Sequence, residues 1–166
     1  MLDHITQLPN RKFVELRMNS LFAETRNSGQ SLGIIIIEVD NFKKVNDQFG
    51  EETGDFILKI IAKTLVASSK PLDLIGRWAG VRFVGMITGI SDEELFAVAS
   101  RIRVLVENSI IKIEPHQPRV TVSIGASMAT SSDTFKSFLK RGEQLLAMSQ
   151  TSGNNRVTIS SKNLVM

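Results

Sequence analysis

The chain has 166 residues, of which 42% are hydrophobic, and this suits a single globular domain over residues 1–166 with a substantial core. It contains no cysteine, no apolar run long enough to span a bilayer and no signal-peptide pattern at Met1, so we expect a disulfide-free cytoplasmic protein without direct membrane insertion. Its 20 lysines and arginines exceed its 17 acidic residues to give a net charge of +3, but they form no basic block, which excludes an obvious nucleic-acid partner.

The first half of the chain predicts two helices on either side of a buried strand. Residues 10–26 repeat apolar side chains with the helical period and end at an Asn-Ser-Gly stop. Residues 32–39 are almost all apolar and rich in isoleucine, which is typical of a strand buried on both faces. After a short polar segment, residues 53–66 again show helical spacing and predict a helix packed on a sheet.

The second half predicts a hairpin and then alternating helices and strands. Residues 73–78 and 84–88 read as two strands joined by a tight turn at Ala79-Gly80, because glycine tolerates the backbone conformations of two-residue turns. Ser91-Asp-Glu-Glu94 is a capping box that begins the next helix. The remaining predicted elements are a strand at residues 119–128, a helix at 133–149 and a strand at 156–159.

The order α-β-α-β-β-α-β-α-β predicts an α+β fold. It contains a βαββαβ core with two additional helices, and such cores form an antiparallel or mixed sheet with the core helices on one face. We expect the isoleucine-rich strand to lie centrally. The tip of the hairpin would then lie beside the end of this strand, near Glu38 and Asp40.

Six motifs follow one another along nearly the whole chain. They are Asp3–Arg11, Glu38–Asp47, Gly50 with Gly54-Asp55, Arg77–Phe83, Val120–Gly125 and Gly153–Arg156. In order and spacing they resemble the GGDEF domain of diguanylate cyclases. The resemblance implies the fold of nucleotidyl cyclases and polymerase palm domains. It also implies chemistry in which two facing domains, each with one GTP and divalent metal, form cyclic di-GMP by phosphoryl transfer.

The resemblance assigns Asn46 and Asp55 to the guanine base, where amide and carboxylate groups match the donors and acceptors of the base edge. From position alone, Asn46 could equally cap a turn and Asp55 a helix. Phe42 and Lys43 fall on the segment that meets the β- and γ-phosphates in the family. From composition alone, Phe42 would be a core residue, and Lys43 and Lys44 a solvated pair.

The family signature falls on Ala79-Gly80-Val81-Arg82-Phe83, where Val81 and Arg82 stand at positions that are acidic in active members. Glu38 stands in place of a metal-binding aspartate, with Asp40 as a nearby acid. These residues resemble a weakened metal site, so we expect Mg²⁺ to bind only when a nucleoside triphosphate is bound with it. We expect Arg82 to pair with Glu38, the alternative being a solvent-exposed arginine at the hairpin tip.

Two further sites differ from the family pattern. Gln150 and Asn154 replace the lysine and arginine that grip the triphosphate, so phosphate binding should be weaker. Lys70 and Asp73 fall on the Arg-x-x-Asp product-inhibition site. The lysine keeps the charge but loses the planar fork of arginine, and this predicts weakened cyclic di-GMP binding.

These substitutions predict a degenerate, catalytically inactive GGDEF domain that acts as a regulatory, nucleotide-sensing or interaction module in cyclic di-GMP signalling. Its expected ligand is GTP or another guanine nucleotide. One alternative is a weak or atypical diguanylate cyclase, and another is a dimerisation or scaffold domain that binds no nucleotide. Family members commonly adjoin sensor or phosphodiesterase domains, so we expect such neighbours in a longer protein, and a second copy of the domain, as partners.

Overall fold

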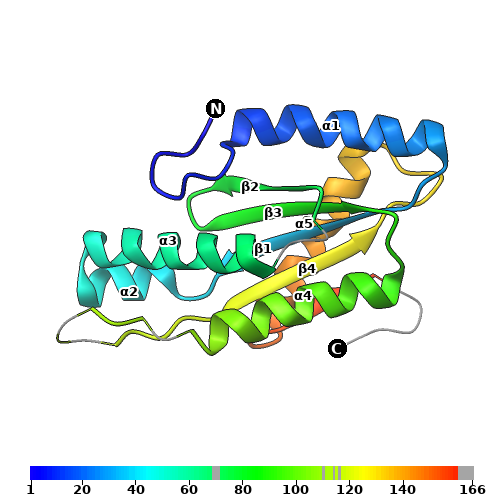
Figure 1. The fold of residues 1–166 in the computed structure, drawn as a ribbon. Coiled ribbons are helices and arrows are strands. Elements are labelled where there is room, and N and C mark those ends of the chain that lie inside the picture. The colour runs from blue at the N-terminus through cyan, green and yellow to red at the C-terminus, as the bar shows by residue number, and fades with distance from the viewer. Residues whose placement is uncertain (69–71, 110, 114, 116, 161–166) are drawn as a thin grey trace.

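The computed structural model describes residues 1–160 except 69–71, 110, 114 and 116 (Figure 1). The elements in chain order are α1 (Arg11–Ser28), β1 (Leu32–Val39), α2 (Phe42–Phe49), α3 (Glu51–Ser68), β2 (Leu74–Ala79), β3 (Arg82–Thr88), α4 (Asp92–Glu107), β4 (Val122–Met128), α5 (Phe135–Thr151) and β5 (Val157–Ile159). This order confirms the predicted succession and adds one helix, α2. None of the helices in the described residues has both the length and the apolar character needed to span a lipid bilayer.

The strands form one five-stranded mixed sheet in the order β2-β3-β1-β4-β5. The central strand β1 is antiparallel to both β3 and β4, while β4 and β5 are parallel. Near its carboxyl end β1 pairs Glu38 with Arg82 on one side and with Ser123 on the other. The predicted α+β class, the central position of β1 and the approach of the hairpin tip to its end are therefore confirmed.

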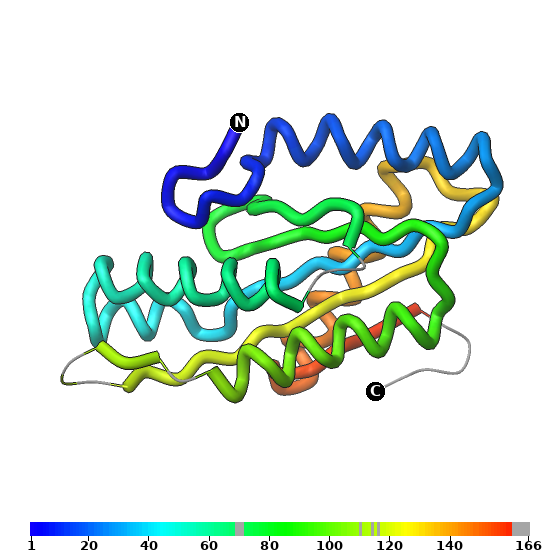
Figure 2. The backbone as a smooth tube through the Cα atoms, viewed as in Figure 1, coloured from blue at the N-terminus to red at the C-terminus, as the bar shows by residue number. Residues whose placement is uncertain are grey.

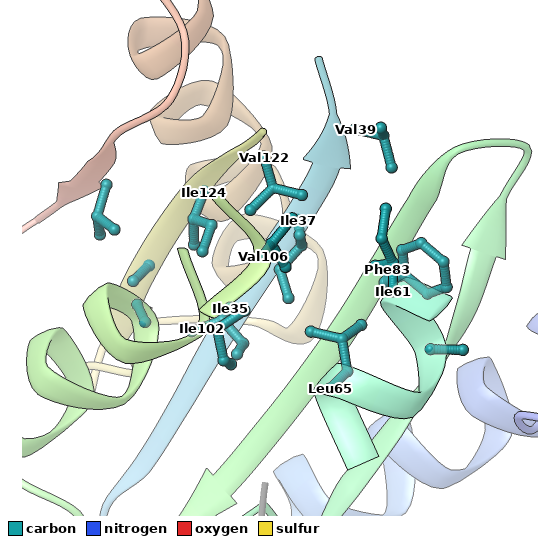
Figure 3. Close-up of a cluster of buried hydrophobic side chains, with 14 of the residues drawn as sticks. Ile35, Ile37, Val39, Ile61, Leu65, Phe83, Ile102, Val106, Val122 and Ile124 are labelled. Atoms are coloured by element: carbon teal, nitrogen blue, oxygen red, sulfur yellow. The ribbon is translucent and has the colours of Figure 1, made fainter. Parts of the chain in front are cut away.

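Helices cover both faces of the sheet (Figure 2). Buried side chains of α3 and α4 share one hydrophobic cluster, and those of α1 and α5 share another. Successive residues of β1 alternate between the clusters, with Ile35 and Ile37 in the first and Ile34 and Ile36 in the second. This alternation explains why β1 is apolar at nearly every position. Figure 3 shows the first cluster, where side chains of α3 and α4 meet β1.

The short polar segment after β1 is the helix α2, which the sequence did not reveal. It has eight residues and lies between Asn41, with φ of 54°, and Gly50, with φ of 94°. Val45 is its one buried residue. Two turns with one buried side chain leave too little hydrophobic periodicity to distinguish a helix from a polar loop.

Most boundaries differ from the predicted ones by one to three residues, and two of these differences bear on the site. Ala79 pairs with Arg82, so the hairpin turn consists of Gly80 and Val81 and lies one residue later than predicted. Gly80 has a positive φ of 38°, as the turn requires. The strand predicted from residue 119 begins at Val122, and the residues before it run beside α2 (Figure 1).

Candidate functional site

The carboxyl end of β1 and the start of β3 bring two opposite charges together. Arg82 Nε and Nη2 lie 3.0 Å and 2.9 Å from the same oxygen, Oε1 of Glu38. The two side chains are 26% and 24% exposed, so the pair is only partly hydrated. Because the residues are directly opposed in the antiparallel ladder, the backbone register itself sets this contact. The expected pairing of Arg82 with Glu38 is confirmed.

Helix α5 adds two side chains to this pair. Gln150 Nε2 donates to Glu38 Oε2 over 2.5 Å, and Arg82 Nη1 lies 3.3 Å from Glu143 Oε2. Both carboxylate oxygens of Glu38 and all three guanidinium nitrogens of Arg82 are therefore engaged. We call these four residues the Glu38–Arg82 cluster. Glu143 was not predicted as a site residue, although it lies two turns before Gln150, a spacing that places both residues on one helix face.

Asp40 belongs to the packing of the sheet end. It is 6% exposed and accepts hydrogen bonds from Thr121 Oγ1 at 2.7 Å, Ser123 Oγ at 2.6 Å and the Asn155 backbone N–H at 3.0 Å. These bonds tie the end of β1 to β4 and to the turn before β5. The described residues contain no group of three or more histidine, cysteine, aspartate or glutamate side chains arranged to hold a metal ion.

Gln150, near the end of α5, and Asn154, just after it, lie at the end of the sheet where β1 terminates. Gln150 contacts Glu38, and Asn154 Oδ1 accepts a long hydrogen bond of 3.4 Å from Ser123 Oγ. Asn154 also adopts a positive φ of 62° within the turn that leads to β5. Both side chains are thus involved in contacts with the protein itself.

The residues assigned to the guanine base gather where α2 packs on α3. A Cβ atom added to Gly54 would lie 1.9 Å from Asn46 Oδ1 and 2.9 Å from Phe42 Cζ, so only glycine permits this approach. Asn46 Oδ1 is buried without a hydrogen-bond partner in the described part of the chain. Asp55, next to Gly54, is half-buried, and Lys43 is exposed. The structure brings Phe42 and Asn46 into contact with the turn of α3 that carries Asp55.

The two residues that the family resemblance assigns to a product-inhibition site are only partly described. Lys70 lies outside the described residues. Asp73 accepts hydrogen bonds from the backbone N–H of Thr88 at 3.0 Å and from its hydroxyl. Thr88 ends β3, whereas Arg82 begins it, so Asp73 lies at the far end of the hairpin from the Glu38–Arg82 cluster.

An arginine that the sequence analysis did not single out fixes the hairpin tip. Arg77 Nη1 lies 3.0 Å and 2.9 Å from the two carboxylate oxygens of Asp3, and its Nε and Nη2 donate to the carbonyl of Gly80. Burial of Asp3 favours its neutral form, but hydrogen bonds from Thr6 and Arg77 outweigh this effect and hold the pKa of the carboxyl below its ordinary value. Asp3 and Arg77 begin the motifs Asp3–Arg11 and Arg77–Phe83, and this was the sequence feature that could have drawn attention to them.

Comparison with known proteins gives the family. The protein-family model described as "Diguanylate cyclase, GGDEF domain" matches residues 1–156. Diguanylate cyclase A of Treponema denticola is 35% identical over 156 residues, covering 92% of this chain and 42% of the relative. Response regulator PleD of Caulobacter vibrioides is 32% identical over 158 residues, covering 93% of this chain and 35% of the relative. The chain thus spans well under half the length of these curated relatives.

Solved structures agree with this result. The GGDEF domain of DgcB from Caulobacter crescentus, solved in complex with c-di-GMP, superposes with a TM-score of 0.91 at 25% identity, covering 95% of this chain and 94% of that one. The active GGEEF domain of a diguanylate cyclase from Vibrio cholerae gives a TM-score of 0.86 at 28% identity, covering 95% and 100%. The chain belongs to the GGDEF domain family of diguanylate cyclases.

Proposed function

We propose that this GGDEF domain binds a guanine nucleotide and regulates cyclic di-GMP signalling without forming cyclic di-GMP itself. The observation that carries the proposal is the guanidinium of Arg82 held on the carboxylate of Glu38. Arg82 places its positive charge and two hydrogen bonds on Oε1 of Glu38, and Gln150 bonds Oε2, so both carboxylate oxygens that a metal ion would need are occupied.

The side chains of the Glu38–Arg82 cluster do not fit magnesium. Mg²⁺ prefers near-octahedral oxygen ligands at about 2.0–2.1 Å. Glu38 already accepts from Arg82 and Gln150 through both oxygens. Val81 packs against the core, and its carbonyl accepts from the Val39 backbone N–H at 3.1 Å. Both carboxylate oxygens of Glu38 and the carbonyl of Val81 already accept hydrogen bonds, and a metal ion would have to displace these contacts.

Several independent losses bear on catalysis. Val81 supplies no carboxylate, Arg82 adds a positive charge, and Gln150 and Asn154 supply no positive charge toward a triphosphate. Removing one transition-state charge contact costs about 3–4 kcal/mol, and each step of about 1.4 kcal/mol lowers a rate tenfold. The combined losses support an inactive domain.

The guanine end of the site supports retained nucleotide binding. A buried acceptor without a partner costs about 1–3 kcal/mol, so Asn46 Oδ1 lowers the stability of the free domain. A functional reason for keeping Asn46 is recognition of a base through its amide group. The side-chain carboxylate of Asp55 has no hydrogen-bond or ion-pair partner among the described residues. Its carboxylate can therefore accept from the N1–H and N2–H groups of guanine.

The setting of the domain is part of the proposal. The matched regions make up 42% or less of the relatives PleD and diguanylate cyclase A. This supports a single domain within a longer cytoplasmic signalling protein, where sensor or phosphodiesterase neighbours, or a second copy, would respond to the bound nucleotide. A solved relative, SiaD, is complexed with an activator protein, which illustrates regulation through a partner.

Calorimetric titration with GTP, GDP, GMP and AMP tests nucleotide binding. We expect a guanine-selective binding event, additional to any binding shared with AMP, that is lost in Asp55→Ala and kept in Asp47→Ala, a matched control on the exposed face of α2. Absence of a guanine-selective event would instead support a scaffold domain without a guanine site.

Incubation with GTP and Mg²⁺ or Mn²⁺, followed by chromatography, tests catalysis. We expect no cyclic di-GMP. Clear product formation by the wild type that disappears in Glu38→Ala would overturn the inactive assignment and support an atypical cyclase.

A further inference from the structure

A cavity of about 570 Å³ lies on the face of α2 that does not contact Gly54 of α3. Lys44, Val45 and Gln48 of α2 form one wall. The segment that runs into β4, with Arg119 and Val120, forms the other. Phe42 and Asn46, which contact α3, point from a different side of the helix. The cavity is therefore separate from the residues assigned to the guanine base.

The acidic side chains of this cavity have partners within the protein, whereas its basic side chains form no salt bridge in the described part of the chain. Its two acids are already engaged, Asp40 by three hydrogen bonds and Glu107 by Arg103 and Asn155. Its two cations, Lys44 and Arg119, are exposed, and no salt bridge joins either of them to an acid in the described part of the chain. The cavity therefore offers two positive charges to a ligand.

The floor and the rim differ in polarity. Val45 and Val120 are 9% and 5% exposed and form an apolar floor, while the amides of Gln48 and Gln117 stand at the rim. The volume lies within the range of small-molecule sites, roughly 300–1,000 Å³. Paired cations bind phosphate through charge-assisted hydrogen bonds. An apolar floor with polar rim groups suits a ligand that joins a phosphate to a ring.

We propose that this cavity is a second ligand site, which binds a small organic phosphate. Lys44 and Arg119 contact the phosphate group, and Val45 and Val120 contact the apolar part. The guanine-base residues of the proposed function are not needed for this binding, since they lie on another face of α2. The outer face of α2 thereby gains a role that the family resemblance does not assign.

Calorimetric titration with AMP tests this site. We expect AMP to bind the wild type and the charge-reversal control Lys63→Glu with equal affinity, because Lys63 is an exposed lysine of α3 outside the cavity. Lys44→Glu and Arg119→Glu should each weaken AMP binding by about tenfold or more, since each replaces a charged hydrogen bond by repulsion. Inorganic phosphate should compete weakly, because it lacks the ring. Circular dichroism checks that the variants fold.

The same titration in Asp55→Ala separates the two sites. We expect AMP binding to persist in this variant. If AMP binding disappears in Asp55→Ala and survives in Lys44→Glu and Arg119→Glu, the nucleotide occupies the guanine site, and the second site is refuted while the proposed function stands. Absence of saturable AMP binding up to about 1 mM would also refute it.

Discussion

Glu38 and Arg82 are opposed residues of neighbouring antiparallel strands, and their charged groups meet at 2.9 Å where β1 ends. The Cβ atoms of directly opposed residues lie about 4.5–5.5 Å apart, so the register holds these side chains together. Gln150 completes the contact from the other oxygen of Glu38. The positive charge beside Glu38 at the end of β1 is therefore supplied by a side chain of the protein itself, Arg82.

The Glu38–Arg82 pair should show coupling in a double-mutant cycle. Because both side chains are partly exposed, we expect Arg82→Ala to lower the free energy of unfolding by about 0.5–1 kcal/mol, with most of this effect absent when Glu38 is already glutamine. Urea denaturation measures both values. Arg101→Ala, at an exposed position of α4, is the matched control. Additive effects of Glu38→Gln and Arg82→Ala would mean that the pair contributes no interaction energy.

Acidic residues at the signature should create magnesium affinity. In the double variant Val81→Asp, Arg82→Glu, the guanidinium is gone and new carboxylates stand beside Glu38, so Mg²⁺ gains the oxygen ligands that it prefers. We expect Mg²⁺ to raise the melting temperature of this variant and to leave that of the wild type unchanged. Potassium chloride at equal ionic strength is the control. An equal magnesium-dependent shift in the wild type would contradict our interpretation of the cluster.

Replacing Asn46 should separate stability from binding. Asn46→Leu removes the buried, unpartnered Oδ1 atom, so we expect the free energy of unfolding to stay the same or rise by about 1 kcal/mol. Guanine binding should be lost, because the amide group is gone. Denaturation and GMP titration measure the two effects. Unchanged GMP affinity would exclude Asn46 from the base site.

Gly54 should tolerate no side chain. The Cβ of Gly54→Ala would lie 1.9 Å from Asn46 Oδ1, so α2 must move away from α3. We expect a loss of about 1–3 kcal/mol in the free energy of unfolding, as for other overpacked contacts, together with weaker GMP binding. Thr53→Ala, in the same turn of α3, serves as the control. Wild-type stability of Gly54→Ala would show that the helices can separate without cost.

Asp133 should contribute to the acid sensitivity of the fold. Hydrogen bonds from Arg141, at 2.8 Å and 2.5 Å, hold the pKa of this carboxyl well below its ordinary value. Because the pKa is lower in the folded protein, the unfolded state binds more protons in acid. The stability from Asp133 is full above about pH 4, near the unfolded pKa, and falls as the pH drops toward the folded pKa.

Asp133→Asn removes this titration and tests its sign. The variant should be less stable at neutral pH, and its free energy of unfolding should fall less steeply than that of the wild type below about pH 4. Urea denaturation as a function of pH measures this slope. Some slope should remain, because the pKa of Asp3 is lowered in the same direction. Parallel pH profiles of the two proteins would contradict a role for Asp133.

The sequence by itself determined the elements that depend on local patterns. The apolar run at residues 32–39 predicted a strand buried on both faces, and the capping box at Ser91 predicted where α4 begins. The order of elements then placed the hairpin tip beside Glu38. Six motifs in order identified the family, because their spacing is specific even where individual residues differ.

Only the tertiary structure decided which side chains meet. Arg77 and Asp3 are 74 positions apart, and Glu143 reaches Arg82 from another element, so no local pattern predicts either contact. The unpartnered Oδ1 atom of Asn46 and the cavity beside Lys44 both depend on how α2 is rotated against its neighbours. The helix α2 is too short to leave a periodic pattern from which this rotation could be predicted. Periodicity determines where helices and strands form, whereas strand register and helix orientation determine the partner of each charged or polar group.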